Sequence, residues 1–175
     1  MALCRIDFWR ATRAAPEPRR QMPILAIYQP DIAQNLGTMM RLCACLGVRV
    51  AIIEPAAFPV SDRAFRRAGL DYLDKVVIER HISFGAFEAW RSEVGFRLVL
   101  LTTSGAVRYD DFAYRDDDIL MVGRESVGVP ERVHQVADAR VRVPMLPGLR
   151  SLNVAVCASM VLGEAMRQTG TLPPD

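Results

Sequence analysis

Short, strongly apolar runs alternate with longer amphipathic segments along most of this 175-residue chain. The first run, Ile24 to Tyr28, is followed by apolar residues at positions 36, 39, 40, 43 and 46, the spacing of one helix face. Residues 48–53 form a second apolar run directly after Gly47. A strand, a helix and a strand in this order predict two parallel strands, because a parallel pair needs a long crossover connection.

The same alternation continues toward the end of the chain. Further strands are expected at residues 75–79, 96–101, 119–122 and 140–143. Further helices are expected at residues 61–69, 83–92, 131–136 and 151–168, the last ended by Gly170. The sequence therefore predicts an α/β fold with a mostly parallel sheet, helices on both faces, and a ligand crevice at the carboxyl ends of the strands.

Three loops follow strands in the second half of the chain, at residues 102–105, 123–130 and 144–150. Gly123 and Gly128 have the spacing of a phosphate-binding loop, but the Lys-Ser/Thr pair that completes such a loop is missing. No GxGxxG motif follows the first strand either, which argues against a standard dinucleotide site. We expect the three loops to form a site for a different ligand.

Composition sets the expected class of protein. No apolar stretch approaches the roughly 18 residues that a membrane span needs, so we expect a soluble, cytoplasmic protein without a membrane partner. The four cysteines include no CxxC pair, which favours reduced thiols over a disulfide framework or a metal site. We expect one domain at residues 23–170, a disordered extension at residues 1–22, and a tail at residues 171–175.

Arg41 lies between Met40 and Leu42 in an otherwise apolar stretch. If Asn35 is the N-cap of this helix, Thr38 and Arg41 fall on neighbouring surface. One interpretation is an arginine that extends to solvent or pairs with a carboxylate. The other is a functional cation.

The last helix is rich in small residues that permit close backbone approach: Ala155, Ala158, Ser159 and Gly163. Tight packing against the sheet explains them without a function, and a self-complementary dimer surface explains them equally well. The acidic run Asp116 to Asp118 is typical of a solvated turn. His81 and His134 have no catalytic companion pattern, so each is expected to be a surface or satisfied residue.

Three segments in fixed order resemble the three motifs of the SPOUT (SpoU/TrmD) RNA methyltransferases. They are Asn35-Leu-Gly-Thr-Met-Met-Arg41, Ile119-Leu-Met-Val-Gly-Arg-Glu-Ser-Val-Gly-Val-Pro130 and Val141-Arg-Val-Pro-Met-Leu-Pro-Gly-Leu-Arg-Ser-Leu-Asn153. The resemblance covers about residues 23–168. Within the superfamily the chain is most similar to the small tRNA (cytidine/uridine-34)-2′-O-methyltransferases, and Arg66-Arg-Ala-Gly-Leu-Asp-Tyr72 is one stretch that supports this.

The resemblance implies a C-terminal deep trefoil knot, a homodimer, and a site for S-adenosylmethionine, with S-adenosylhomocysteine as product. By motif match, the methyl donor is expected to contact Leu101, Gly123, Val143 and Ser151. Glycine at such a site lets the backbone approach a flat ligand closely.

The same resemblance implies Arg41 and Asn35 as catalytic residues. A guanidinium with a pKa above about 12 does not lose its proton in a protein. We therefore interpret Arg41 as a group that orients the ribose hydroxyl and stabilises developing negative charge, with a substrate phosphate as a candidate proton acceptor. Glu125, Arg150 and Asn153 are expected to support the site, and the RNA-contacting cations are expected to be Arg63, Arg66 and Arg67.

The implied function is 2′-O-methylation of the wobble nucleotide, position 34, in the anticodon stem-loop of a tRNA. One departure concerns the RNA target: Val154-Ala-Val156 follows Asn153 where this subgroup is expected to have Leu-Ser-Asn. The alternative is 2′-O-methylation of ribosomal RNA or of another tRNA position. A non-catalytic RNA-binding knot is the third interpretation.

Overall fold

The computed structural model describes residues 22–58 and 76–174. The predicted extension, apart from Met22, and the predicted helix at 61–69 with its three arginines lie outside these residues. The strands are β1 (Ile24–Tyr28), β2 (Val50–Ile53), β3 (Ile78–His81), β4 (Arg97–Leu101), β5 (Val107–Arg108), β6 (Asp118–Val122) and β7 (Ala139–Arg142). The helices are α1 (Ala33–Leu46), α3 (Phe84–Val94), α4 (Glu131–Val136) and α5 (Val154–Thr169).

These strands form one sheet in the order β3-β2-β1-β6-β4-β7-β5, and every neighbouring pair is parallel. The predicted parallel sheet is confirmed. β1 lies in the middle of the sheet, between β2 and β6. After β1 the chain adds β2 and β3 on one side, and the later strands then add on the other side, beginning with β4 and β6. Such a reversal opens a crevice at the carboxyl edge of an α/β sheet, where ligands commonly bind.

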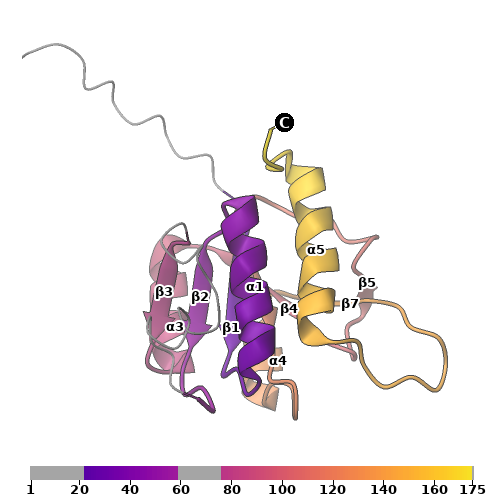
Figure 1. Cartoon of the computed structure of the whole chain (residues 1–175), viewed down its shortest axis with the longest axis horizontal. Coiled ribbons are helices and arrows are strands. Elements are labelled where there is room, and N and C mark those ends of the chain that lie inside the picture. Colours follow the sequence, from indigo (N-terminus) through magenta and orange to yellow (C-terminus); the bar gives the residue numbers. More distant parts are fainter. Residues whose placement is uncertain (1–21, 59–75, 175) are drawn as a thin grey trace, which may run out of the picture.

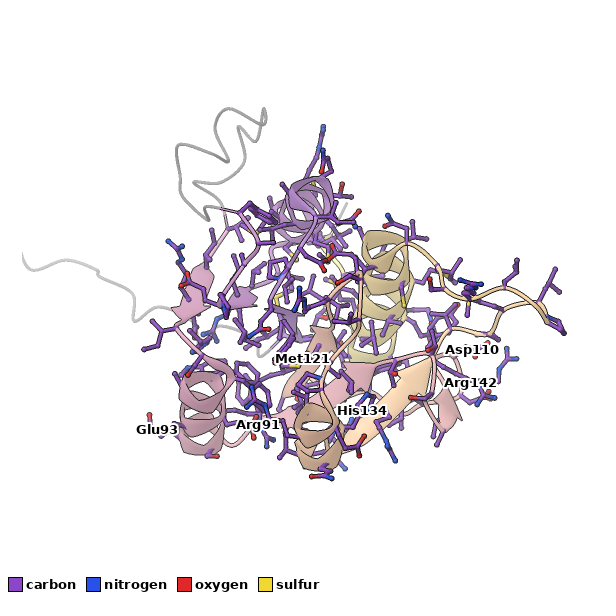
Figure 2. All side chains as sticks on the ribbon, turned by 90° about the horizontal axis from the view of Figure 1, so that it is seen from below. Arg91, Glu93, Asp110, Met121, His134 and Arg142 are labelled. Carbon is purple, nitrogen blue, oxygen red and sulfur yellow. The ribbon has the colours of Figure 1, made fainter. Side chains whose placement is uncertain are left out.

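Helices cover both faces of the sheet, with α1 and α5 on one side and α3 and α4 on the other (Figure 2). Successive residues of a strand point to opposite faces, and β1 shows this clearly. Leu25 and Ile27 pack with α1 and α5, while Ile24, Ala26 and Tyr28 pack with α3 and α4. All five residues of β1 are buried, which explains why its sequence reads as a continuous apolar run.

Helices α1 and α5 lie side by side in front of the sheet (Figure 1). Ala155 and Ala158 are buried in the core that α5 shares with α1, together with Leu36 and Met40 of α1. Tight packing is therefore confirmed for these two alanines. A different stripe of α5, formed by Val156 and Met160, remains exposed.

The acidic run was only partly predicted. Asp118 is completely buried at the start of β6, and its carboxylate accepts hydrogen bonds of 2.6 Å and 2.8 Å from the guanidinium of Arg97 on β4. The interpretation of this residue as part of a solvated turn is wrong. Register explains the difference, because Arg97 and Asp118 are partners in the β4–β6 ladder.

Two strands at the sheet edges also differ from expectation. β3 begins at Ile78, later than the predicted start at residue 75, and β5 was not predicted. β5 has only two residues, both exposed, and it exists because it pairs with β7. Such a short edge strand leaves no periodic pattern in the sequence. Among the described residues, no helix is long and apolar enough to cross a membrane.

Candidate methyl-donor cleft at the carboxyl edge of the sheet

Parallel register places the ends of three strands next to one another. Leu101, the last residue of β4, pairs with Val122 on β6 and with Val141 on β7. The chain leaves all three strands at the same edge, so the loops that begin at Thr102, Gly123 and Val143 are neighbours. The three loops predicted to form the site are thus brought together.

A cleft of about 600 Å³ lies between these loops and the starts of α1 and α5. A cleft of this size suits a cofactor, since small-molecule sites typically enclose about 300–1,000 Å³. All four predicted donor contacts, Leu101, Gly123, Val143 and Ser151, line it. The predicted supporting residues line it as well: Asn35, Glu125, Arg150 and Asn153.

Gly123 has no room for a side chain. A Cβ atom there would lie 2.9 Å from the backbone carbon of Gly128 and 2.9 Å from Cγ1 of Val129. The loop closes this tightly because Arg124 and Gly128 exchange two backbone hydrogen bonds, of 3.1 Å and 2.9 Å, and Gly128 adopts a left-handed φ of 69°. Glycine at position 123 therefore lets the two ends of this loop lie against each other at the wall of the cleft.

A chain of side-chain hydrogen bonds joins three separate segments at the cleft. Nδ2 of Asn153 donates to Oδ1 of Asn35 at 2.9 Å, and Nδ2 of Asn35 donates to Oε1 of Glu125 at 3.0 Å. These residues come from the start of α5, the start of α1 and the loop after β6. The chain of bonds fixes the two helix ends against that loop.

The predicted cap of α1 is wrong. The helix begins at Ala33 with Ile32 as N-cap, and the buried Asn35 lies in the first turn, where its side chain points to Glu125 and Asn153. By the capping rules, the Asn35 side chain would accept a hydrogen bond from a free backbone N–H at the helix start. It is bound instead by two residues distant in sequence.

The predicted start of α5 is also corrected. Asn153 is the N-cap, and its Oδ1 accepts from the backbone N–H groups of Ala155 and Val156 at 2.9 Å and 3.3 Å. The helix itself begins at Val154, so Ser151 lies before the first turn and is exposed. Ser151 still lines the cleft, but it belongs to the loop and not to the helix.

Two carboxylates meet beside the cleft with pKa values shifted in opposite directions. Burial, followed by its hydrogen bond with Asp31, raises the pKa of Glu125. The side-chain hydrogen bond with Glu125, together with bonds from Ser126 and from the backbone of Glu125, holds the pKa of Asp31 well below its usual range. Asp31 is therefore the member of the pair that carries its charge most persistently.

Several cleft residues were not predicted. His134, labelled in Figure 2, lines the cleft from α4, together with Arg124 from the loop after β6 and Cys157 from α5. Arg124 stands inside the second motif, but no role was predicted for it. No local motif marks His134 or Cys157, because they reach the cleft only when separate segments converge. His81, in contrast, is buried on the far side of the sheet against Phe87 and Trp90, and burial lowers its pKa.

Arg41 does not line the cleft. It is exposed on α1, six residues beyond Asn35, a separation of about 9 Å along a helix axis. The fold thus brings the predicted donor contacts together and leaves Arg41 on the outer surface beside them. Arg63, Arg66 and Arg67 lie outside the described residues.

Comparison with known proteins identifies the family. A model of the SpoU rRNA methylase family matches residues 22–163. The tRNA (cytidine(34)-2′-O)-methyltransferase of Beijerinckia indica is 68% identical over 149 residues, which cover 85% of this chain and 93% of the relative.

Solved structures agree. A structure that gives insights into the 2-OH methylation of C/U34 on tRNA matches with a TM-score of 0.79 and 36% identity, over 85% of this chain and 97% of that one. The SpoU methyltransferase AviRb from Streptomyces viridochromogenes, in complex with the cofactor AdoMet, matches with a TM-score of 0.76 and 26% identity, over 86% of this chain and 61% of that one. These matches confirm the resemblance inferred from the three motifs: the chain belongs to the SpoU rRNA methylase family.

Proposed function

We propose that this protein transfers the methyl group of S-adenosylmethionine to the ribose 2′-oxygen of the wobble nucleotide, position 34, of a tRNA. The observation that carries this proposal is the 68% identity to a tRNA (cytidine(34)-2′-O)-methyltransferase across 93% of that protein. The cleft supports it, because the four residues expected to contact the donor all line one cavity.

The cleft residues fit the donor chemically. Its walls combine apolar side chains, such as Leu101 and Val143, with loop backbone around Gly123, and this suits a flat adenine read by backbone polar groups. We propose that Leu101, Gly123, Val143 and Ser151 hold the donor. When bound, S-adenosylmethionine supplies an activated methyl group on a sulfonium centre.

The chain's own residues then have to position the ribose hydroxyl and stabilise charge on its oxygen. Arg41 is the proposed cation for this role, and Asn35 is proposed to hold the neighbouring loop in place through Glu125 and Asn153. A guanidinium stays protonated, so Arg41 orients the hydroxyl and stabilises the developing alkoxide, while a substrate phosphate accepts the proton. The position of Arg41 beside the cleft is compatible with contact to RNA and not to the donor.

We propose that Arg63, Arg66 and Arg67 contact RNA phosphates, as positively charged side chains commonly do in RNA complexes. Their contribution is proposed to be affinity for the anticodon stem-loop and not choice of base. We also propose that the protein acts in the cytoplasm, where a tRNA substrate would be available.

A homodimer and a trefoil knot complete the proposal. Leu152, Val156 and Met160 succeed one another at intervals of four residues at the start of α5 and along it, and they are 41%, 50% and 37% exposed. Val156 and Met160 lie on one face of α5, and Leu152 lies in the loop just before its N-cap. We propose that a second copy covers these exposed apolar side chains. The knot is proposed from the family resemblance, and the return of the chain from β7 to pack α5 beside α1 is compatible with it.

Ribosomal RNA is the second candidate substrate, because the matching family is described by rRNA methylation. The two substrates are separated by incubating the protein with tritiated S-adenosylmethionine and either bulk tRNA or ribosomal RNA, then mapping the modified nucleotide. We expect label only in tRNA, at the ribose of nucleotide 34. An anticodon stem-loop with a 2′-deoxy residue at position 34 is the matched control and should stay unlabelled. Label confined to ribosomal RNA would replace the proposed substrate.

Arg41→Ala should lower kcat by about 100-fold or more, the usual effect of removing a group that stabilises a developing oxyanion. Donor affinity, measured by calorimetry, should stay within about threefold of wild type, since Arg41 does not line the cleft. Arg167→Ala is the matched control, because Arg167 is an exposed arginine at the far end of α5 paired with Glu164. A loss of donor binding in Arg41→Ala would assign Arg41 a structural role.

Gly123→Ala should weaken donor binding by about tenfold or more, which corresponds to about 1.4 kcal/mol. The added Cβ would meet the Gly128 backbone at 2.9 Å, so the loop at the cleft wall must shift. Calorimetric titration with S-adenosylhomocysteine measures the effect. Gly85→Ala in α3 is the control, since a Cβ at that exposed helical position would meet only Oγ of Ser83, at 3.8 Å. Equal affinities for both variants would exclude a donor contact at the 123 backbone.

Sedimentation equilibrium at micromolar concentration should give twice the mass of one chain. Val156→Asp combined with Met160→Asp should give the monomer mass, because burying two carboxylates at an apolar interface is costly. Val136→Asp, at an exposed position of α4, is the control and should remain dimeric. A monomeric wild-type protein would refute the dimer.

A further inference from the structure

Asp31 forms a reciprocal clasp between two loops that are 94 residues apart in sequence. Its Oδ1 accepts a hydrogen bond from the backbone N–H of Glu125 at 3.0 Å, and its Oδ2 accepts one from the backbone N–H of Ser126 at 3.3 Å. The hydroxyl of Ser126 donates to the same Oδ2. In return, the backbone N–H of Asp31 donates to Oε2 of Glu125 at 3.2 Å.

The clasp acts on a loop that buries little apolar surface and that is also bonded to the start of α1 through the Asn35–Glu125 hydrogen bond. Between Gly123 and Pro130, Ser126 and Gly128 are exposed, and Val127 is 72% exposed. Apolar burial therefore contributes little to this stretch, and an internal pair of backbone bonds between Arg124 and Gly128 shapes it without tying it to the body of the protein. The bonds from Asp31 tie it to the loop between β1 and α1.

The same carboxylate also faces a cation of the cleft wall. Nε of Arg124 lies 3.6 Å from Oδ2 of Asp31, and in the described part of the chain this buried Nε has no hydrogen-bond partner. The Asp31 side chain is only 12% exposed, so its charge is poorly screened by solvent at this distance. Asp31 thus sets the place of Arg124 as well as that of the Glu125 and Ser126 backbone.

We propose that Asp31 is a positioning residue for the methyl-donor site: it holds the Gly123–Gly128 loop in its donor-binding form without touching the donor. The inference rests on the proposed function in taking the cleft as the donor site. Asp31 itself does not line the cleft, whereas Gly123, Arg124 and Glu125 do. Its persistently ionised state suits the role, because a carboxylate accepts N–H and O–H donors strongly.

The position of the clasp predicts which kinetic constant changes. The hydrogen bonds of the Asp31 side chain go to the donor-binding loop, whereas Arg41 lies ten residues further along the chain on the exposed face of α1. Losing the clasp should therefore weaken donor binding and leave the methyl-transfer step at saturating donor nearly unchanged. A residue that merely stabilised the fold would lower the unfolding temperature and the amount of active protein, with no change in the donor Kd of the folded fraction.

Asp31→Asn is the main test, because it keeps the shape and removes the charge. We expect the Kd and KM for S-adenosylmethionine to rise about tenfold, with kcat within about threefold and KM for tRNA within about twofold of wild type. Asp110→Asn is the matched control, since Asp110 is an exposed aspartate paired with Arg108 and does not line the cleft. Thermal unfolding of each variant is recorded in parallel.

Ser126→Ala keeps the measurement decisive if Asp31→Asn does not fold. It removes only the hydroxyl bond to Asp31 and should raise the donor Kd about threefold. An unchanged donor Kd in the folded variants, or a loss confined to kcat, would overturn the proposal. Donor binding by a wild-type protein that does not methylate tRNA would refute the proposed substrate, while the same Kd comparison would still decide the role of Asp31.

Discussion

Parallel pairing of β1, β6, β4 and β7 directs the carboxyl ends of these strands to one edge of the sheet, and the cleft depends on this pairing. Leu101 lies between Val122 and Val141 in the ladder, so loops that start 20 or more residues apart become neighbours. Close packing on both faces holds the strands in register, because a shift by one residue would exchange the β1 side chains between the two core layers and disrupt the packing of both. The cleft is therefore a consequence of core packing before any polar residue contributes to it.

Polar contacts then refine what the sheet assembles. Asn153 caps α5 with its oxygen and uses its nitrogen to reach Asn35, which in turn reaches Glu125. Each group in this chain of bonds is satisfied by another group in it, and partly buried polar groups are stabilising only under that condition. Asp31 extends the same network to the far side of the loop after β6. One helix start, one loop and a second helix start are thereby held as a unit around the cleft.

Prediction from sequence succeeded where the physical signal is local and repeated. The apolar runs of β1, β4 and β6 and the glycine that ends α5 follow short-range rules, and the structure has them. Prediction failed where a partner distant in sequence decided the outcome. By local rules Asn35 would be a good N-cap, but its side chain is bound by Glu125 and Asn153. By local rules Asp118 would be a solvent-exposed acid, but it is buried and paired with Arg97.

The sequence by itself determined the fold class and the family, because hydrophobic period and motif order can be read along the chain, and it predicted four donor contacts that line one cleft. Tertiary structure alone decided that His134 lines the cleft, that Asp31 holds the loop at its wall and that Arg41 stands outside it. The physical reason is that side-chain hydrogen bonds and cavity walls depend on which loops meet in space. Residues 94 positions apart, such as Asp31 and Glu125, carry no signal of their contact until the parallel sheet has brought their loops together.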